Sequence, residues 1–180
     1  MISKTKLLIL TILLIALAIV PSVFADEVFG NLPDNGVYGG WCSPVALGFS
    51  VPEGENFRLD AARLGLTHLA NDSVTLEIYS DNEGVPGQAV ATIGNRTVVR
   101  DSIYTFEAGG GMTLSGGQTY WLYVDASACN VTWDDIGEVQ PSGDFSVVGY
   151  LRFTNEWVDA SDDGRLMPAL LLNATELSGN

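Results

Sequence analysis

Short strand-like runs separated by frequent turns constrain the fold of this chain more than any other feature. After residue 25, segments rich in Val, Ile, Thr, Tyr and Phe alternate with turns that contain glycine or proline, at intervals of about 8–12 residues. No stretch there has the sustained apolar stripe of an amphipathic helix. The pattern predicts an all-β protein: a single antiparallel β-sandwich, jelly-roll-like, that no linker divides.

Two predicted strands differ in how apolar and polar side chains are distributed between their two faces. Residues 74–78 alternate strictly between apolar and polar side chains. Residues 119–124 are apolar or aromatic on both faces, with Tyr120 on one face and Trp121 and Tyr123 on the other. A strand of the second kind is central and covered, or it carries an aromatic binding face.

The other strands are predicted from similar runs. Residues 58–70 are ambiguous, because Leu59 and Ala62 have helical spacing, but the alternation of Leu64 and Leu66 favours a strand. The remaining strands are predicted at residues 38–42, 46–51, 104–106, 145–153 and 166–172, with further starts at 88–93 and 97–100 and with turns at 81–84 and 109–111.

The N-terminal segment has the layout of a secretory signal peptide. Two lysines precede an uncharged apolar run over residues 7–20, and Val23 and Ala25 stand at the −3 and −1 positions of a cleavage site. The run is shorter than the roughly 20 apolar residues of a spanning helix, which favours cleavage over an uncleaved anchor. We therefore expect a signal peptide over residues 1–25, a β-sandwich domain over 26–180, and a secreted or cell-surface protein.

The charge of the mature chain limits its partners. Both lysines precede the cleavage site, so the mature chain carries six arginines, no lysine and all 22 acidic residues, a formal charge of −16. Nucleic acids and anionic membrane surfaces need Lys or Arg to neutralise phosphates, so neither is expected as a partner. We also expect no membrane span in the mature chain, and the lack of lysine excludes Lys–Asn cross-links.

Cys42 and Cys129 are the only cysteines. An even count in an exported chain predicts one disulfide, although two buried thiols or an intermolecular bond would also account for it. The loop that such a bond closes is long, so the chain-entropy model gives a stabilisation of about 4–5 kcal/mol.

Two segments carry a resemblance to a known family. Residues 74–87 read VTLEIYSDNEGVPG and residues 112–122 read MTLSGGQTYWL, with Phe106 between them. This arrangement resembles the choice-of-anchor R domain of bacterial exported surface proteins, over residues 46–172. The resemblance implies an exported β-sandwich whose biochemical activity is undefined. The sequence has neither the sorting signal that often follows such domains nor a lipobox cysteine, so we expect a released or non-covalently retained protein.

Catalytic groups are sparse. His68 is the only imidazole and lies in a predicted strand, so a structural role is favoured over that of a catalytic base or a zinc ligand. The glycines of 109–111 lie between two strand-like runs and do not open a helix, which argues against a phosphate loop. We expect no enzymatic activity. A carboxylate-dependent glycan hydrolase stays open as a less favoured alternative, because acidic residues are abundant.

Calcium is the candidate ion, and otherwise no cofactor is expected. Hard cations take oxygen ligands from clustered Asp and Asn, as at residues 81–83 and at Asp159, Asp162 and Asp163. The simpler interpretation of both clusters is that Asx residues cap tight turns, and we favour it.

Exposed aromatic rings are the candidate organic-ligand site. Flat rings stack on sugar faces, and Trp41, Trp157 and Tyr123 can supply them. For Trp121 we favour a place in the core, because large aromatics also fill the space between sheets.

Together these observations predict a non-catalytic exported β-sandwich that acts at the cell surface or extracellularly, in adhesion, matrix or glycan contact. The expected partner is a glycan or another matrix or cell-surface component. The main alternative is a structural subunit of an extracellular assembly, formed when exposed strand edges pair between copies.

Overall fold

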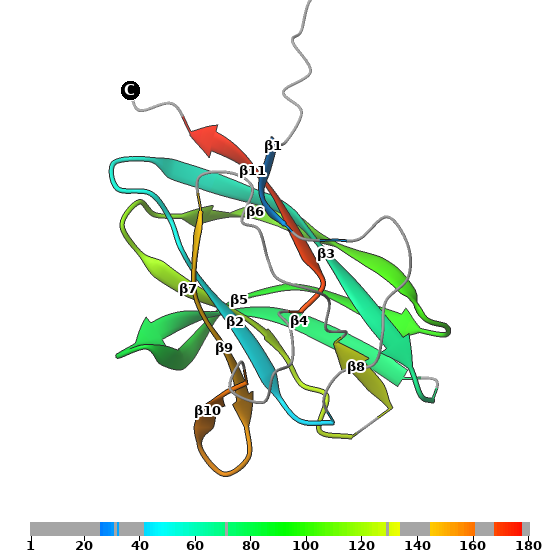
Figure 1. Ribbon diagram of the computed structural model, residues 1–180. Coiled ribbons are helices and arrows are strands. Elements are labelled where there is room, and N and C mark those ends of the chain that lie inside the picture. The colour runs from blue at the N-terminus through cyan, green and yellow to red at the C-terminus, as the bar shows by residue number, and fades with distance from the viewer. Residues whose placement is uncertain are drawn as a thin grey trace, which may run out of the picture.

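The computed structural model describes residues 26–30, 32, 42–70, 72–128, 130–133, 145–160 and 168–177. The predicted fold class is confirmed, because these residues form two antiparallel sheets packed face to face (Figure 1). Over the same residues there is no helix that is long and apolar enough to cross a membrane.

The first sheet has five strands. Its order is β1–β11–β3–β6, and β8 pairs with the last residues of β3. The bounds of these strands are β1 Asp26–Gly30, β3 Asn56–His68, β6 Ser102–Leu114, β8 Val131–Trp133 and β11 Leu170–Leu177.

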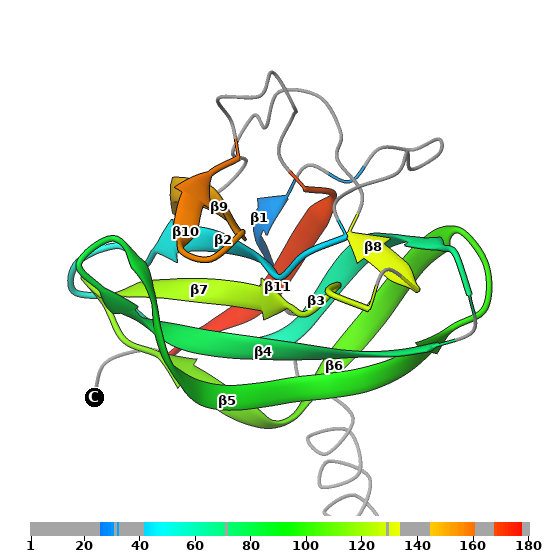
Figure 2. The ribbon, with the colours of Figure 1, turned by 90° about the horizontal axis from the view of Figure 1, so that it is seen from below.

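The second sheet has six strands in the order β10–β9–β2–β7–β4–β5. The bounds are β2 Val45–Ser50, β4 Asp72–Asn82, β5 Val85–Val98, β7 Thr119–Val124, β9 Ser146–Phe153 and β10 Trp157–Asp159. Strands β1 to β7 together with β11 follow the order of a jelly roll. The β9–β10 hairpin is added beyond β2 (Figure 2).

The core lies between the two sheets and uses the inward side of each alternating strand. Val74, Leu76 and Ile78 of β4 are buried, as the alternation predicts, and Leu122 and Val124 of β7 join them. Full burial of one such side chain is worth about 1.5–3 kcal/mol. The predicted strand at 74–78 is therefore confirmed and lies within a longer one.

Strand β3 resolves the ambiguous segment. Residues 58–70 fall almost entirely within this strand, as expected, and Leu59, Ala62, Leu64 and Leu66 are all buried. A β-bulge at Asp60 inserts one extra residue, since Leu59 pairs with Ala174 and Ala61 with Asn173. The bulge puts Leu59 and Ala62 on the same face of a strand, which explains their helical spacing.

The two predicted turns have different outcomes. At 81–84 the chain makes a two-residue hairpin turn between β4 and β5, with Glu83 and Gly84 at φ values of 56° and 87°. At 109–111 the predicted turn is wrong, because the glycines lie inside β6. There they form a large bulge, since Ala61 pairs with Glu107 but Leu59 pairs with Met112, so that five residue steps on β6 oppose two on β3.

Several predicted boundaries are also corrected. The separate starts at 88–93 and 97–100 are one strand, β5, whose pairing with β4 is interrupted by bulges. The last strand begins at Leu170 and continues to Leu177, so it lies later than the predicted 166–172. The predicted strand at 38–42 lies outside the described residues, apart from Cys42. Strand β1 was not predicted from the sequence, because it depends on pairing with β11, which lies far away in the chain.

Candidate functional site

The outer face of the six-stranded sheet carries an aromatic surface. In β7, Trp121 and Tyr123 face outward while Tyr120 packs against Phe49 in the core. Tyr123 stands opposite Glu77 of β4, and its ring centroid lies 4.7 Å from that of Tyr79. Strand β7 is therefore central and also carries an aromatic outer face.

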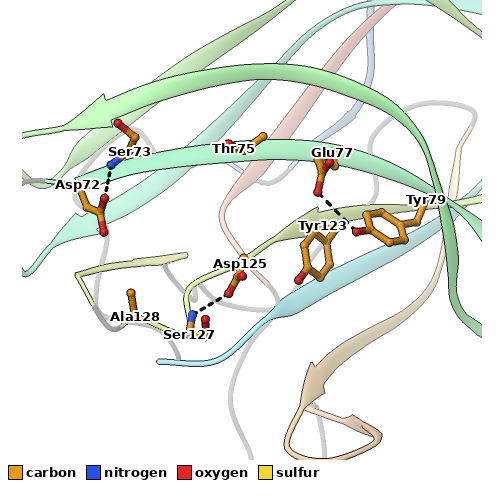
Figure 3. A pocket seen from close by; sticks show the side chains of 9 residues that line it. All are labelled: Asp72, Ser73, Thr75, Glu77, Tyr79, Tyr123, Asp125, Ser127 and Ala128. Atoms are coloured by element: carbon orange, nitrogen blue, oxygen red, sulfur yellow. Dashed lines mark hydrogen bonds between the residues drawn. The ribbon is translucent and has the colours of Figure 1, made fainter.

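A cleft of about 530 Å³ opens beside these rings. Strand β4 forms one side, and the end of β7 with the residues after it forms the other (Figure 3). We call it the tyrosine–carboxylate cleft, and its lining residues are Asp72, Ser73, Thr75, Glu77, Tyr79, Tyr123, Asp125, Ser127 and Ala128. Figure 3 shows the two rings towards one end and Asp72 at the other.

The three carboxylates of the cleft are held by neighbouring donors. Asp72 accepts hydrogen bonds from the Asn130 side-chain amide at 2.8 Å and from the Ser73 backbone N–H at 2.7 Å. These two bonds lower the pKa of Asp72, so its carboxylate stays charged at a lower pH than that of an ordinary aspartate. Asp125 accepts from the Ser127 backbone N–H at 2.9 Å, and Glu77 accepts from the Tyr79 hydroxyl at 3.5 Å.

The two phenols of the cleft remain protonated at neutral pH. Burial raises the pKa of Tyr123 to about 12, and the neighbouring Asp125 carboxylate adds to this effect. Burial and the Glu77 carboxylate raise the pKa of Tyr79 as well. The Tyr123 hydroxyl can therefore donate a hydrogen bond to a ligand, whereas the Tyr79 hydroxyl already donates to Glu77 and the three carboxylates only accept.

A second group of rings continues the aromatic surface onto the β9–β10 hairpin. Trp157 meets Tyr123 edge-on with ring centroids 6.2 Å apart, and Phe153 lies 5.4 Å from Trp157. Phe153 is 40% exposed and Trp157 is half-buried. The structure thus brings together Tyr123 and Trp157, two of the predicted stacking residues. Trp41, the third, lies outside the described residues.

Trp121 differs from its predicted place. The side chain is buried, with 1% of its surface exposed, but it packs on the outer face of the sheet and not between the sheets. Its ring lies across the backbone of Gly48 and Gly149, where a Cβ atom would approach the ring to 2.9 and 3.5 Å. The indole N–H donates to Asp81 at 2.8 Å.

The first predicted calcium cluster is occupied by structural contacts. One oxygen of Asp81 accepts from Trp121 and the other accepts from the Gly84 backbone N–H at 3.2 Å, so this residue caps the hairpin turn. In the second cluster Asp159 ends β10, while Asp162 and Asp163 lie outside the described residues. Within the described ranges, no group of three His, Cys, Asp or Glu side chains is placed to hold a metal ion.

Cys42 and His68 are not among the residues that line the cleft. Cys42 precedes β2, and Cys129 lies outside the described residues, so their disulfide stays a prediction. His68 ends β3, where it pairs with Val131 and its backbone N–H donates to Asp101 at 2.8 Å.

Most of the cleft residues were not singled out from the sequence. Glu77 and Tyr79 share one face of β4 by simple alternation. In the same way, Tyr123 shares the outer face of β7 with Trp121. Their meeting depends on β4 and β7 being neighbours, which the sequence alone does not indicate. Asp72 and Asp125 lie at strand ends, where acidic residues are common.

Comparison with protein-family models, with curated proteins and with solved structures found no match to this chain. The resemblance to the choice-of-anchor R domain therefore rests on the quoted segments.

Proposed function

We propose that this protein is an exported, non-catalytic β-sandwich that binds glycans at the cell surface or in the extracellular matrix through the tyrosine–carboxylate cleft. The observation that supports this most strongly is the meeting of Tyr79 and Tyr123 with three carboxylates in one open cleft. Aromatic faces bind the apolar faces of sugar rings, and carboxylates and hydroxyls bind the sugar hydroxyls.

The sequence supports the extracellular part of the proposal. The signal-like segment over residues 1–25 and the resemblance to exported surface domains both favour a protein that acts outside the cell. Mass spectrometry of the protein recovered from the culture medium and from the cell surface should show a chain that begins at Asp26. An intact chain retained inside the cell would contradict this part.

The test of glycan binding uses the mature chain on a glycan array, followed by calorimetry on the sugars that bind. Tyr123→Ala removes a ring of the cleft and should abolish binding, whereas Tyr123→Phe keeps the ring and should retain most of it. Val99→Ala is the control, because Val99 is 57% exposed and follows β5 outside the cleft. Absence of binding to any glycan, or equal losses in Tyr123→Ala and Val99→Ala, would contradict the proposal.

A carboxylate-dependent glycan hydrolase remains a second candidate because Glu77 and Asp125 line the same cleft. Incubation of the mature protein with the glycans that it binds separates the two functions. Release of reducing ends that is lost in both Glu77→Gln and Asp125→Asn would favour the hydrolase. Retention of intact oligosaccharide would favour the binding protein.

The alternative of a structural subunit predicts self-association. Among the described strands, β6 ends the five-stranded sheet, and its outer edge is interrupted by the glycine bulge, a feature that blocks edge-to-edge pairing in many sheets. An apparent mass from light scattering that stays constant as the concentration rises would favour the glycan-binding monomer. A rise in apparent mass with concentration would favour assembly.

A further inference from the structure

We infer that the tyrosine–carboxylate cleft selects sugars that carry a free ammonium group, such as glucosamine oligomers, over their N-acetylated and acidic counterparts. This inference rests on the proposed function and specifies the ligand class of the same site. It is carried by two independent features of the cleft: its donor and acceptor inventory, and its pair of aromatic rings.

The inventory favours a positively charged ligand. Of the nine lining residues, Asp72, Glu77 and Asp125 are acidic and none is Lys, Arg or His. Hydrogen bonds from Ser73 and Asn130 hold the Asp72 carboxylate in place, and a bond from Ser127 does so for Asp125. An ammonium group brings three donors to such acceptors and forms charge-assisted hydrogen bonds, which are about twice as strong as neutral ones.

The rings favour the same charge. The Tyr79 and Tyr123 centroids are 4.7 Å apart with 40° between the ring planes, and both rings border the cleft. Faces of aromatic rings attract cations within about 6 Å of the centroid, and the attraction adds to ordinary stacking. A protonated amino sugar can therefore use both its ring face and its ammonium group in this cleft.

The cleft also opposes negative charge. Three carboxylates line the cleft, and burial, followed by the charge of Asp125, raises the pKa of Tyr123 to about 12, so a further anion beside these groups is unfavourable. A uronic acid or a sulfated sugar would bring its anion against the same carboxylates. Such sugars should be excluded.

The experiment compares oligomers of equal length in calorimetry with the mature chain. The probes are glucosamine, N-acetylglucosamine and galacturonic acid oligomers, at a mildly acidic pH where the amine is protonated. Asp72 remains charged there because its hydrogen bonds with Asn130 and Ser73 lower its pKa. We expect the glucosamine oligomer to bind at least about tenfold more tightly than its N-acetylated form, less tightly as salt is raised, and the acidic oligomer not to bind.

Isosteric variants separate the cleft from the general charge of the protein. Asp125→Asn and Glu77→Gln should each weaken binding of the glucosamine oligomer by a larger factor than binding of the N-acetylglucosamine oligomer, and so reduce the preference for glucosamine. Glu107→Gln removes the same single charge from an exposed position on β6 outside the cleft and should leave the preference unchanged.

The outcomes distinguish the inference from the proposed function. If no glycan binds at all, the proposed function fails. If N-acetylglucosamine or acidic oligomers bind as tightly as glucosamine oligomers, the inference is overturned while glycan binding stands. If Glu107→Gln lowers the preference as much as Asp125→Asn does, the preference reflects overall charge, and the inference is overturned as well.

Discussion

The hydrogen bond between Trp121 and Asp81 offers the most direct test of how the outer face of the sheet is held. Trp121 is 1% exposed and its indole N–H donates to Asp81, so Asp81→Ala leaves a largely buried donor without its charged acceptor. A hydrogen bond to a charged group contributes about 1.5–3 kcal/mol, and a bond within an exposed turn contributes about 0.5–1 kcal/mol. Asp81→Ala loses both, so we expect the free energy of unfolding to fall by about 3 kcal/mol.

The assay is urea denaturation followed by tryptophan fluorescence, with two comparison variants. Asp81→Asn keeps an acceptor for the indole but removes the charge, and should cost about 1 kcal/mol. Glu83→Gln removes one charge from the same turn without contact to Trp121, and should stay within about 0.5 kcal/mol of the parent protein. This variant also corrects for the reduced self-repulsion of an acidic chain.

A double-mutant cycle gives the decisive comparison. In a Trp121→Phe background the indole N–H is gone, so Asp81→Ala should cost only the turn contribution of about 0.5–1 kcal/mol. If Asp81→Ala behaves like Glu83→Gln in the parent protein, or costs the same with and without the indole, the hydrogen bond does not stabilise this face and the reasoning fails.

Three further predictions concern the turn, the cleft and the cysteines. Glu83 has a left-handed φ of 56°, so Glu83→Gly should relieve strain and raise the urea midpoint, with a net gain of about 0.5 kcal/mol; a lower midpoint would refute this. Because the pKa of Tyr123 is raised from 10.0 to about 12 in the folded protein, its contribution to stability is complete below pH 10 and is lost as the pH rises towards 12. Unfolding free energies measured across that range should fall less steeply in Tyr123→Phe, and an equal slope would count against the shift. Strands β2 and β7 pair up to Val45 and Val124, and the chain beyond this point leads to Cys42 and Cys129 respectively; thiol titration of the denatured, unreduced protein should find no free thiol, and two thiols per chain would contradict the disulfide.

The sequence predicted the strands that show plain alternation and failed where bulges or long-range pairing decide the outcome. Residues 74–78 were placed correctly because every second side chain enters the core. The bulge at Asp60 gave Leu59 and Ala62 a helix-like spacing, and the glycines at 109–111 produced a bulge where a turn was predicted. Both depend on contacts with neighbouring strands, which periodicity does not report.

The site was predicted in part for the same reason. Tyr123 and Trp157 were predicted as exposed stacking rings; the structure places them in contact, but both are half-buried. Their partner Tyr79 was not, because only the pairing of β4 with β7 brings it to Tyr123. Asp81 and Trp121 belong to the two separate segments that carry the family resemblance. Their hydrogen bond joins those two segments across the pairing of β4 with β7.

The position of β11 bears on when this chain can fold. The last strand lies between β1 and β3, so the five-stranded sheet lacks an inner member until residues 170–177 have been synthesised (Figure 1). Contacts between such distant parts of a sequence form slowly, because a long loop must close before they stabilise the fold. We therefore expect a nascent chain with this strand order to complete its five-stranded sheet only after β11 has left the ribosome.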